Sequence, residues 1–183
     1  ERGVVKRTKL DAFSRPKRGG IIAINLDDDD RLIAVRLVFA NQDVILATRE
    51  GQAVRFRESA VRAMGRAARG VRGVRLRDAD RVVGAVAGTD DVTLLTVCEK
   101  GLGKRTPISE YRQTNRGGLG VINVKVTERT GKVVSVLEVI DEDEVLIVTR
   151  NGMVIRLPIR SVRCIGRNTQ GVKLITLSEG DSV

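Results

Sequence analysis

The side chains that could do chemistry in this sequence are mainly arginines and lysines, and that chemistry is the binding of anions. The chain has 33 basic and 23 acidic residues, a formal net charge of +10. A guanidinium fork matches the oxygens of a phosphate, and glycine-rich backbone can add N–H donors to the same anion. The charge therefore predicts a polyanionic partner, with nucleic acid favoured over an anionic membrane surface.

Other kinds of chemistry have little support in the residues. The chain has no histidine, and Cys98 and Cys164 lie far apart, which excludes the usual zinc spacings and histidine-based acid–base catalysis. We expect both cysteines to be reduced and buried in the core. The acidic runs Asp27–Asp30 and Asp141–Glu144 are interpreted as solvated turns between strands, because no nucleophile or base accompanies them. We predict no catalytic residue, no metal site and no cofactor.

The basic residues are carried by an internal repeat. Gly3, Gly51, Gly101 and Gly152 each open a similar phrase, and their separations are 48, 50 and 51 residues. An arginine follows each glycine after four residues, and a bulky apolar or aromatic residue follows after ten. The arginines are Arg7, Arg55, Arg105 and Arg156, and the bulky residues are Phe13, Val61, Tyr111 and Val162.

Each repeat contains four short β-branched segments, separated by glycines and polar turns, which are typical of strands. Four strands in about 50 residues predict an all-β fold, a propeller-like array of four-stranded blades. The first strands are expected at Ile21–Leu26, Val71–Leu76, Val121–Val126 and Val172–Leu177, and second strands begin at Arg31, Arg81 and Lys132. Third strands are expected at Val44–Thr48, Val92–Val97 and Val145–Thr149, each followed by a turn and an arginine-bearing fourth strand.

We interpret residues 1–183 as one domain with repeats at about 1–48, 49–98, 99–149 and 150–183, the last of them incomplete. The incomplete last repeat has two explanations. Either the chain is a fragment of a longer domain, or its first and last segments together complete one blade and close a ring. Phe13, Phe39, Phe56 and Tyr111 are expected to pack in the core or between blades.

The excess charge is confined to one position of the repeat. The windows 14–26, 59–77, 111–126 and 159–177 carry 16 basic residues and no acidic residue, whereas the rest of the chain has 17 basic and 23 acidic residues. Equivalent loops around an axis would form a basic belt on the rim or across one face. The DNA-binding residues predicted from these windows are Arg15, Lys17, Arg18, Arg62, Arg66, Arg69, Arg72, Arg75, Arg112, Arg116, Arg160, Arg163, Arg167 and Lys173.

Such a belt suits the backbone of bent duplex DNA, where phosphate contacts release counterions and offset the cost of bending. Only 2% of the residues are aromatic, which disfavours single-strand and RNA binding by base stacking. No recognition helix is predicted, so we expect little sequence specificity. Two other hypotheses compete with DNA binding. One is a protein-interaction propeller with a mixed-charge face, and the other, ranked last, is an enzyme.

Four long phrases carry a family resemblance that covers essentially the whole chain. The sequence resembles the C-terminal domain of the DNA gyrase A subunit, and a close paralogue, the topoisomerase IV C subunit, is the alternative within this class. The phrases are VRAMGRAARGVRGVRL from Val61, GLGKRTPISEY from Gly101, KVTERTGKVVSV from Lys125 and IGRNTQGVKLI from Ile165.

This resemblance implies a β-pinwheel, whose blades exchange strands, and a role in wrapping DNA during ATP-dependent supercoiling by the whole enzyme. It implies as partners the rest of the gyrase A subunit, together with the gyrase B subunit, and it places the catalytic groups and ATP site outside this domain. It also implies a bacterial, nucleoid-associated location in the cytoplasm. We expect the isolated domain to be a monomer.

The basic heptapeptide Q-R-R-G-G-K-G that marks the first gyrase blade is absent. Its nearest relatives are PKRGG at Pro16–Gly20 and QTNRGGLG at Gln113–Gly120, which are expected to serve as ordinary rim contacts. The chain is therefore similar to the later blades of the family. No apolar run approaches the ~20 residues of a membrane span, and the Glu1 start lacks the apolar region of a signal peptide. We expect a cytoplasmic protein without a membrane partner.

Overall fold

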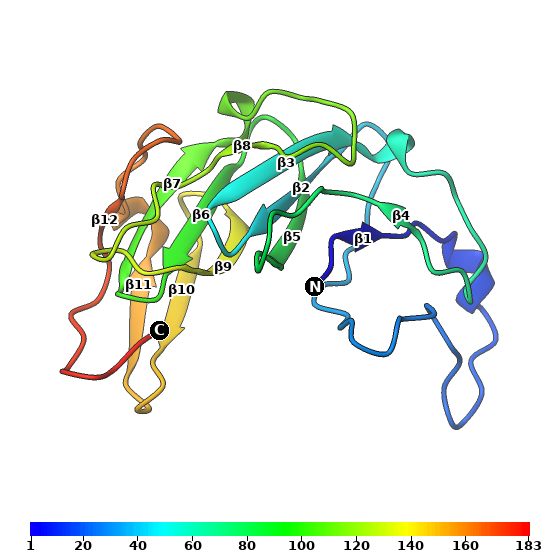
Figure 1. Cartoon of the computed structure of the whole chain (residues 1–183), viewed down its shortest axis with the longest axis horizontal. Helices are drawn as coiled ribbons and strands as arrows, with labels where there is room; N and C mark the ends of the chain where they lie inside the picture. Colours follow the sequence, from blue (N-terminus) through cyan, green and yellow to red (C-terminus); the bar gives the residue numbers. More distant parts are fainter.

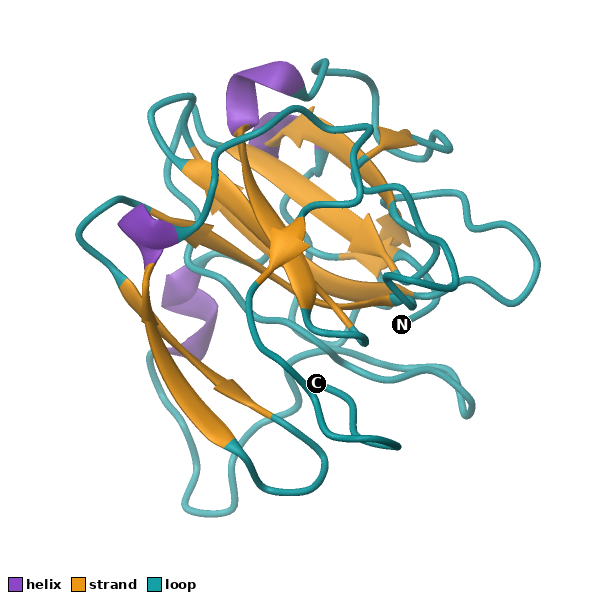
Figure 2. Cartoon of the chain, turned by 90° about the vertical axis from the view of Figure 1, so that its left-hand side faces the viewer, coloured by secondary structure: helices purple, strands orange, loops and turns teal.

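Short strands joined by turns make up the structure, a computed structural model that describes all residues 1–183 (Figure 2). The first six strands are β1 (Val4–Val5), β2 (Asp43–Thr48), β3 (Gln52–Arg57), β4 (Val71–Arg72), β5 (Val82–Gly88) and β6 (Thr93–Cys98). The others are β7 (Leu102–Pro107), β8 (Val121–Ile122), β9 (Val133–Val139), β10 (Glu144–Val148), β11 (Val154–Pro158) and β12 (Val172–Lys173). Single 3-10 turns follow β1, β3, β7 and β11: η1 (Leu10–Phe13), η2 (Glu58–Ala60), η3 (Ile108–Glu110) and η4 (Ile159–Ser161).

The blades exchange strands between units. One four-stranded antiparallel sheet has the order β5-β2-β3-β8, and the next has the order β12-β7-β6-β9. In each sheet a hairpin is flanked by strands that arrive later: β5 follows the β2–β3 hairpin, and β8 arrives only after the β6–β7 hairpin of the next blade. The expected all-β pinwheel is confirmed.

The glycine that opens each phrase has a positive φ, and at Gly3, Gly51 and Gly101 close packing requires it as well. Gly51 has φ +82° in the turn between β2 and β3, in the left-handed region that side chains disfavour. A Cβ atom there would lie 2.5 Å from the carbonyl oxygen of Val124, which belongs to the next unit. Gly101 repeats the arrangement, with φ +75° and 2.7 Å to the oxygen of Ile175. The turns at Gly51 and Gly101 must therefore admit the backbone of the next unit.

The largest core cluster lies between the two complete blades. It joins Ile45 and Val86 of the first sheet to Leu94 and Val136 of the second, and Tyr111 packs among them. The buried Tyr111 hydroxyl donates to Asn123 Oδ1 at 2.6 Å, and Asn123 Nδ2 donates to Thr96 at 3.1 Å. Small β-branched residues fill the rest of the cluster, as the composition predicts.

The first unit departs from the predicted strands. No strand forms at Ile21–Leu26 or between Arg31 and Gln42, and both predictions are wrong. In later units the second strand pairs with the preceding hairpin, as β5 does with β2, but the segment that starts at Arg31 pairs with no strand. Val35 and Phe39 are therefore exposed, by 74% and 68%, so packing of Phe39 in the core is also wrong.

Phe56 and Tyr111 are buried as expected, and Phe13 is half-buried. The last unit is also incomplete, because β10 and β11 form a sheet of only two strands. The units follow one another along an open arch (Figure 1). β4, β8 and β12 lie on the outer side of the arch, and β5 and β9 lie on its inner side (Figure 1). The first and last segments do not pair with each other.

Candidate nucleic-acid interface

Three arginines occupy the same place in successive units. Arg62, Arg112 and Arg163 each follow the buried residue that closes an η helix, and all three are exposed. Their guanidinium groups make no hydrogen bond or ion pair within the chain. Each starts a loop that leads to the outer strands β4, β8 and β12. The structure therefore presents three unpartnered cations at equivalent points along one side of the arch.

Arginines of the hairpins hold these loops in place. Arg55 Nη1 donates to the carbonyl oxygens of Ile108 at 2.7 Å and Tyr111 at 3.2 Å, and Arg105 Nε donates to the oxygen of Val162 at 2.9 Å. These carbonyls belong to the η helix of the following unit and to the residue that closes it. Arg55 and Arg105, which follow Gly51 and Gly101 by four residues, thus have a structural role that their charge alone does not reveal.

A buried lysine supports one of the loops from beneath. Lys104 Nζ donates to the carbonyl oxygens of Gly166 at 2.7 Å and Arg167 at 2.5 Å. Burial lowers the pKa of Lys104 to about 8, and the nearby carboxylate of Glu110 opposes that shift. Lys6 bonds the carbonyl oxygens of Gly65 and Arg66 in the same way, and burial also lowers its pKa.

The carbonyl groups of Gly166 and Arg167 point toward Lys104, so the amide groups that follow them point away from it. In a trans peptide the C=O and the following N–H point in opposite directions, so the N–H groups of Arg167 and Asn168 face away from Lys104. Arg167 N–H donates to a carboxylate oxygen of Glu110 at 3.3 Å. The outward amide of Arg167 therefore already donates to an anionic oxygen of the protein itself.

The Lys104 amine makes a testable prediction about stability. Between pH 8 and the ordinary lysine pKa of 10.5, the unfolded chain binds a proton that the folded chain does not, so stability rises with pH. The unfolding free energy of the wild type relative to Lys104→Met should increase by about 1–3 kcal/mol between pH 7.5 and 10. Urea unfolding at both pH values measures this difference. The exposed Lys100→Met is the control, and a difference that stays constant with pH would contradict the prediction.

The other predicted site residues fall into two groups. Arg72, Arg75, Arg160 and Lys173 are exposed and make no side-chain hydrogen bond or ion pair within the chain. Arg69 forms an ion pair with Asp27. Arg66, Arg116 and Arg167 donate to backbone carbonyls of the preceding unit. The windows 59–77, 111–126 and 159–177 therefore contain both free and engaged cations.

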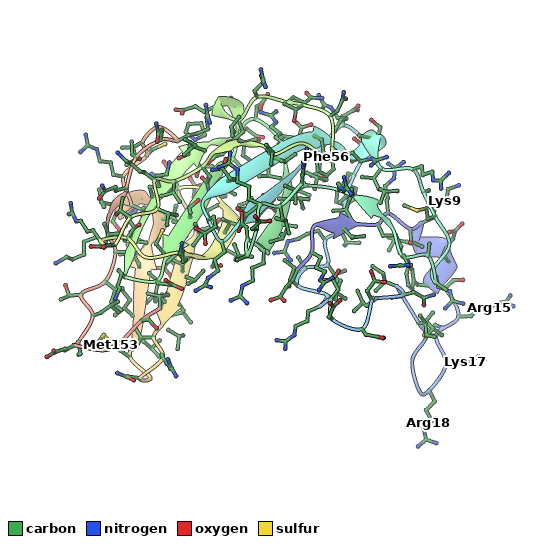
Figure 3. All side chains as sticks on the ribbon, in the orientation of Figure 1. Lys9, Arg15, Lys17, Arg18, Phe56 and Met153 are labelled. Carbon is green, nitrogen blue, oxygen red and sulfur yellow. The ribbon has the colours of Figure 1, made fainter.

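The first window lies apart from the others. Arg15, Lys17 and Arg18 are exposed, and Lys17 and Arg18 lie toward the tip of a loop that projects from the N-terminal end of the arch (Figure 3). The structure thus aligns three of the four predicted windows along the outer side and leaves the first window separate.

A glycine-rich hollow of about 410 Å³ accompanies the middle loop. Arg112 and Arg116 line it together with Thr114, Asn115 and the backbone of Gly117–Gly120, and none of its lining residues is acidic. Guanidinium groups, hydroxyl and amide side chains beside glycine backbone suit an anionic oxygen more than an apolar ligand.

Two expectations about single residues are corrected. Cys98 is buried, and burial raises its pKa to about 11, but Cys164 is exposed in the loop beside Arg163. The acidic turn at Asp27–Asp30 is not merely solvated, because Asp30 accepts hydrogen bonds from the backbone N–H groups of Arg2 at 3.0 Å and Arg31 at 2.8 Å. No three histidine, cysteine or acidic side chains are grouped as metal ligands would be, and no helix has the length and apolar character of a membrane span.

Comparisons with known proteins agree with this geometry. The family model described as "DNA gyrase C-terminal domain, beta-propeller" matches residues 1–38, 42–87, 93–139 and 143–183. The DNA gyrase A subunit of Chlamydia pneumoniae is 45% identical over 185 aligned residues, which cover 100% of this chain and 22% of that protein. The corresponding protein of Salmonella typhimurium is 46% identical over 181 residues, covering 99% and 21%.

Solved structures show the same architecture. A structure of the DNA gyrase A C-terminal domain has a TM-score of 0.88 at 29% identity and covers 99% of this chain and 60% of its own. The C-terminal domain of DNA topoisomerase IV has the same TM-score at 23% identity, covering 95% and 55%, and this likeness concerns the fold alone. The chain spans about a fifth of the length of the curated relatives it matches.

Proposed function

Since the chain belongs to the DNA gyrase C-terminal domain family, we propose that it binds the backbone of duplex DNA and bends the duplex along the outer side of the arch. One observation carries the proposal: Arg62, Arg112 and Arg163 stand exposed and unpartnered at equivalent positions of three successive units. Cations in a repeated position suit a ligand whose own charges repeat, as DNA phosphates do.

We call the outer surface formed by the three basic loops the rim. The hydrogen-bond donors of the rim favour binding to the DNA backbone. Guanidinium groups and glycine-rich backbone bind phosphate oxygens but read no base edges, so sequence dependence should be weak. Because the rim follows an arch, a duplex that touches all three loops has to bend. Bending a short duplex costs a few kcal/mol, which multiple phosphate contacts offset.

This domain would support ATP-dependent supercoiling by a whole gyrase, which contains the rest of the A subunit together with the B subunit. The domain would supply binding and bending and no catalytic group, in a nucleoid-associated enzyme. Arg15, Lys17 and Arg18, on their separate loop, would meet the duplex only where it continues beyond the aligned rim. A protein-interaction propeller is the alternative, but the free cations of the rim favour a polyanion.

A topological assay tests the proposal. A nicked plasmid sealed by ligase in the presence of saturating protein should retain a linking-number change, because the writhe of DNA wrapped around the arch is trapped. An unchanged topoisomer distribution would overturn wrapping. In parallel, the affinity for a short duplex should fall steeply between 50 and 200 mM salt, by on the order of 10-fold or more for a few phosphate contacts. A duplex affinity that does not change with salt concentration would favour a protein partner.

A further inference from the structure

Each basic loop is fastened to the unit before it by the same pair of contacts. The loop segments are 66–68, 116–118 and 167–169, and each lies across the segment one unit earlier, at 22–25, 72–75 and 122–125. In the first contact a loop arginine donates to a backbone carbonyl oxygen. The pairs are Arg66 Nη1 to Ile22 at 3.1 Å, Arg116 Nη1 to Arg72 at 3.0 Å and Arg167 Nη1 to Ile122 at 2.9 Å.

The second contact runs in the opposite direction, from backbone N–H to backbone carbonyl. Arg75 N–H donates to Gly118 at 2.9 Å and Lys125 N–H donates to Thr169 at 2.9 Å, while Asn25 and Ala68 approach to 3.5 Å in the first unit. Gly117 N–H adds a bond to the oxygen of Gly73 at 2.6 Å. We call this two-way arrangement the interunit clasp.

Resting on the proposed function, we propose that Arg66, Arg116 and Arg167 are positioning residues that set the spacing of the phosphate-binding cations. The clasp holds the segments that carry Arg72 and Arg75 against the loop that carries Arg112. Because the contact repeats in each unit, it fixes the distance from one unit's cations to the next. These three arginines would thus act through the backbone they hold and not as phosphate ligands.

The chemistry of the contact requires arginine and not merely a positive charge. Arg116 uses two nitrogens on two carbonyls, with Nε bonded to Ala60 at 2.9 Å and Nη1 bonded to Arg72. A rigid planar fork can hold both acceptors at once, whereas a lysine ammonium on a flexible stem cannot reproduce that geometry. The Arg167 Cζ also lies 5.9 Å from the centroid of the Tyr111 ring, within the range of a cation–π contact.

A charge-preserving substitution separates positioning from phosphate contact. In Arg116→Lys the charge remains but the fork is lost, so we expect duplex affinity to fall about 5–10-fold with an unchanged salt dependence. In Arg129→Lys, at an exposed guanidinium that makes no hydrogen bond or ion pair and lies outside the basic windows, affinity should stay within about 2-fold of the wild type. Arg167→Lys repeats the test in the next unit.

An independent readout needs no DNA. In Arg116→Lys the Arg75 amide should lose protection against hydrogen exchange by about 10-fold or more, while amides of β2 and β6 keep theirs and show that the variant is folded. Unchanged Arg75 exchange, or affinity equal to the wild type, would overturn the clasp inference. A wild-type chain that binds no duplex would instead overturn the proposed function, and the exchange measurement would still decide whether the clasp orders this segment.

Discussion

Replacing Arg62, Arg112 and Arg163 together with glutamate is expected to weaken duplex binding by about 100-fold or more at moderate salt. These guanidinium groups are free in all three units, so their loss removes phosphate contacts without removing any bond that holds the fold. The reversed charges would also repel the phosphates. Fluorescence anisotropy with a short duplex, repeated at several salt concentrations, measures both the affinity and its salt slope, and the slope should fall by about three.

The matched control carries the same change of charge at another place. Lys100, Arg129 and Arg150 are exposed residues without side-chain partners, and they lie in turns away from the η helices that start the basic loops. Their replacement by glutamate lowers the net charge by the same amount, so a purely global effect of charge would weaken binding equally. Equal losses in the two variants would contradict the proposed rim. A loss of thermal stability in the rim variant alone would show that the three arginines have a structural role.

The repeat could be predicted from the sequence because its physical requirements fall on single residues. Gly51 and Gly101 are needed where a hairpin turn admits a neighbouring backbone, and such a requirement recurs at a fixed spacing. The buried residues Val61, Tyr111 and Val162 recur for a similar reason, since each closes an η helix against the core. Fold class and the position of the basic loops followed from these positions.

The roles of individual arginines could not be predicted in the same way. Arg112 and Arg116 lie four residues apart in one loop, yet the first is free and the second holds a carbonyl 44 residues away. Nothing local distinguishes them, because the acceptors are backbone atoms brought close only by strand exchange. The same limit explains the segment after Arg31, whose apolar pattern predicts a strand that forms only beside a preceding hairpin.

Replacing the buried Arg55 with methionine is expected to lower the unfolding free energy by about 3–5 kcal/mol. Arg55 Nε donates to Asp43 at 2.7 Å and Nη2 pairs with Asp90 at 2.6 Å, and the Arg55 and Asp43 side chains are only 7% and 2% exposed. Removing the guanidinium leaves the Asp43 carboxylate buried with Arg57 as its remaining partner, 3.3 Å away. It also frees the carbonyls of Ile108 and Tyr111 that position the middle loop.

The repeat supplies the control, because Arg156 occupies the equivalent position in the last unit. Its side chain is 70% exposed and pairs with Glu144 in the same hairpin, so Arg156→Met should cost at most about 1 kcal/mol. Adding Asp43→Leu to Arg55→Met should recover part of the stability, since the unpaired charge is then removed. Urea unfolding measures all three variants. Equal losses for Arg55→Met and Arg156→Met would mean that the buried Arg55–Asp43 pair contributes no more stability than the exposed Arg156–Glu144 pair.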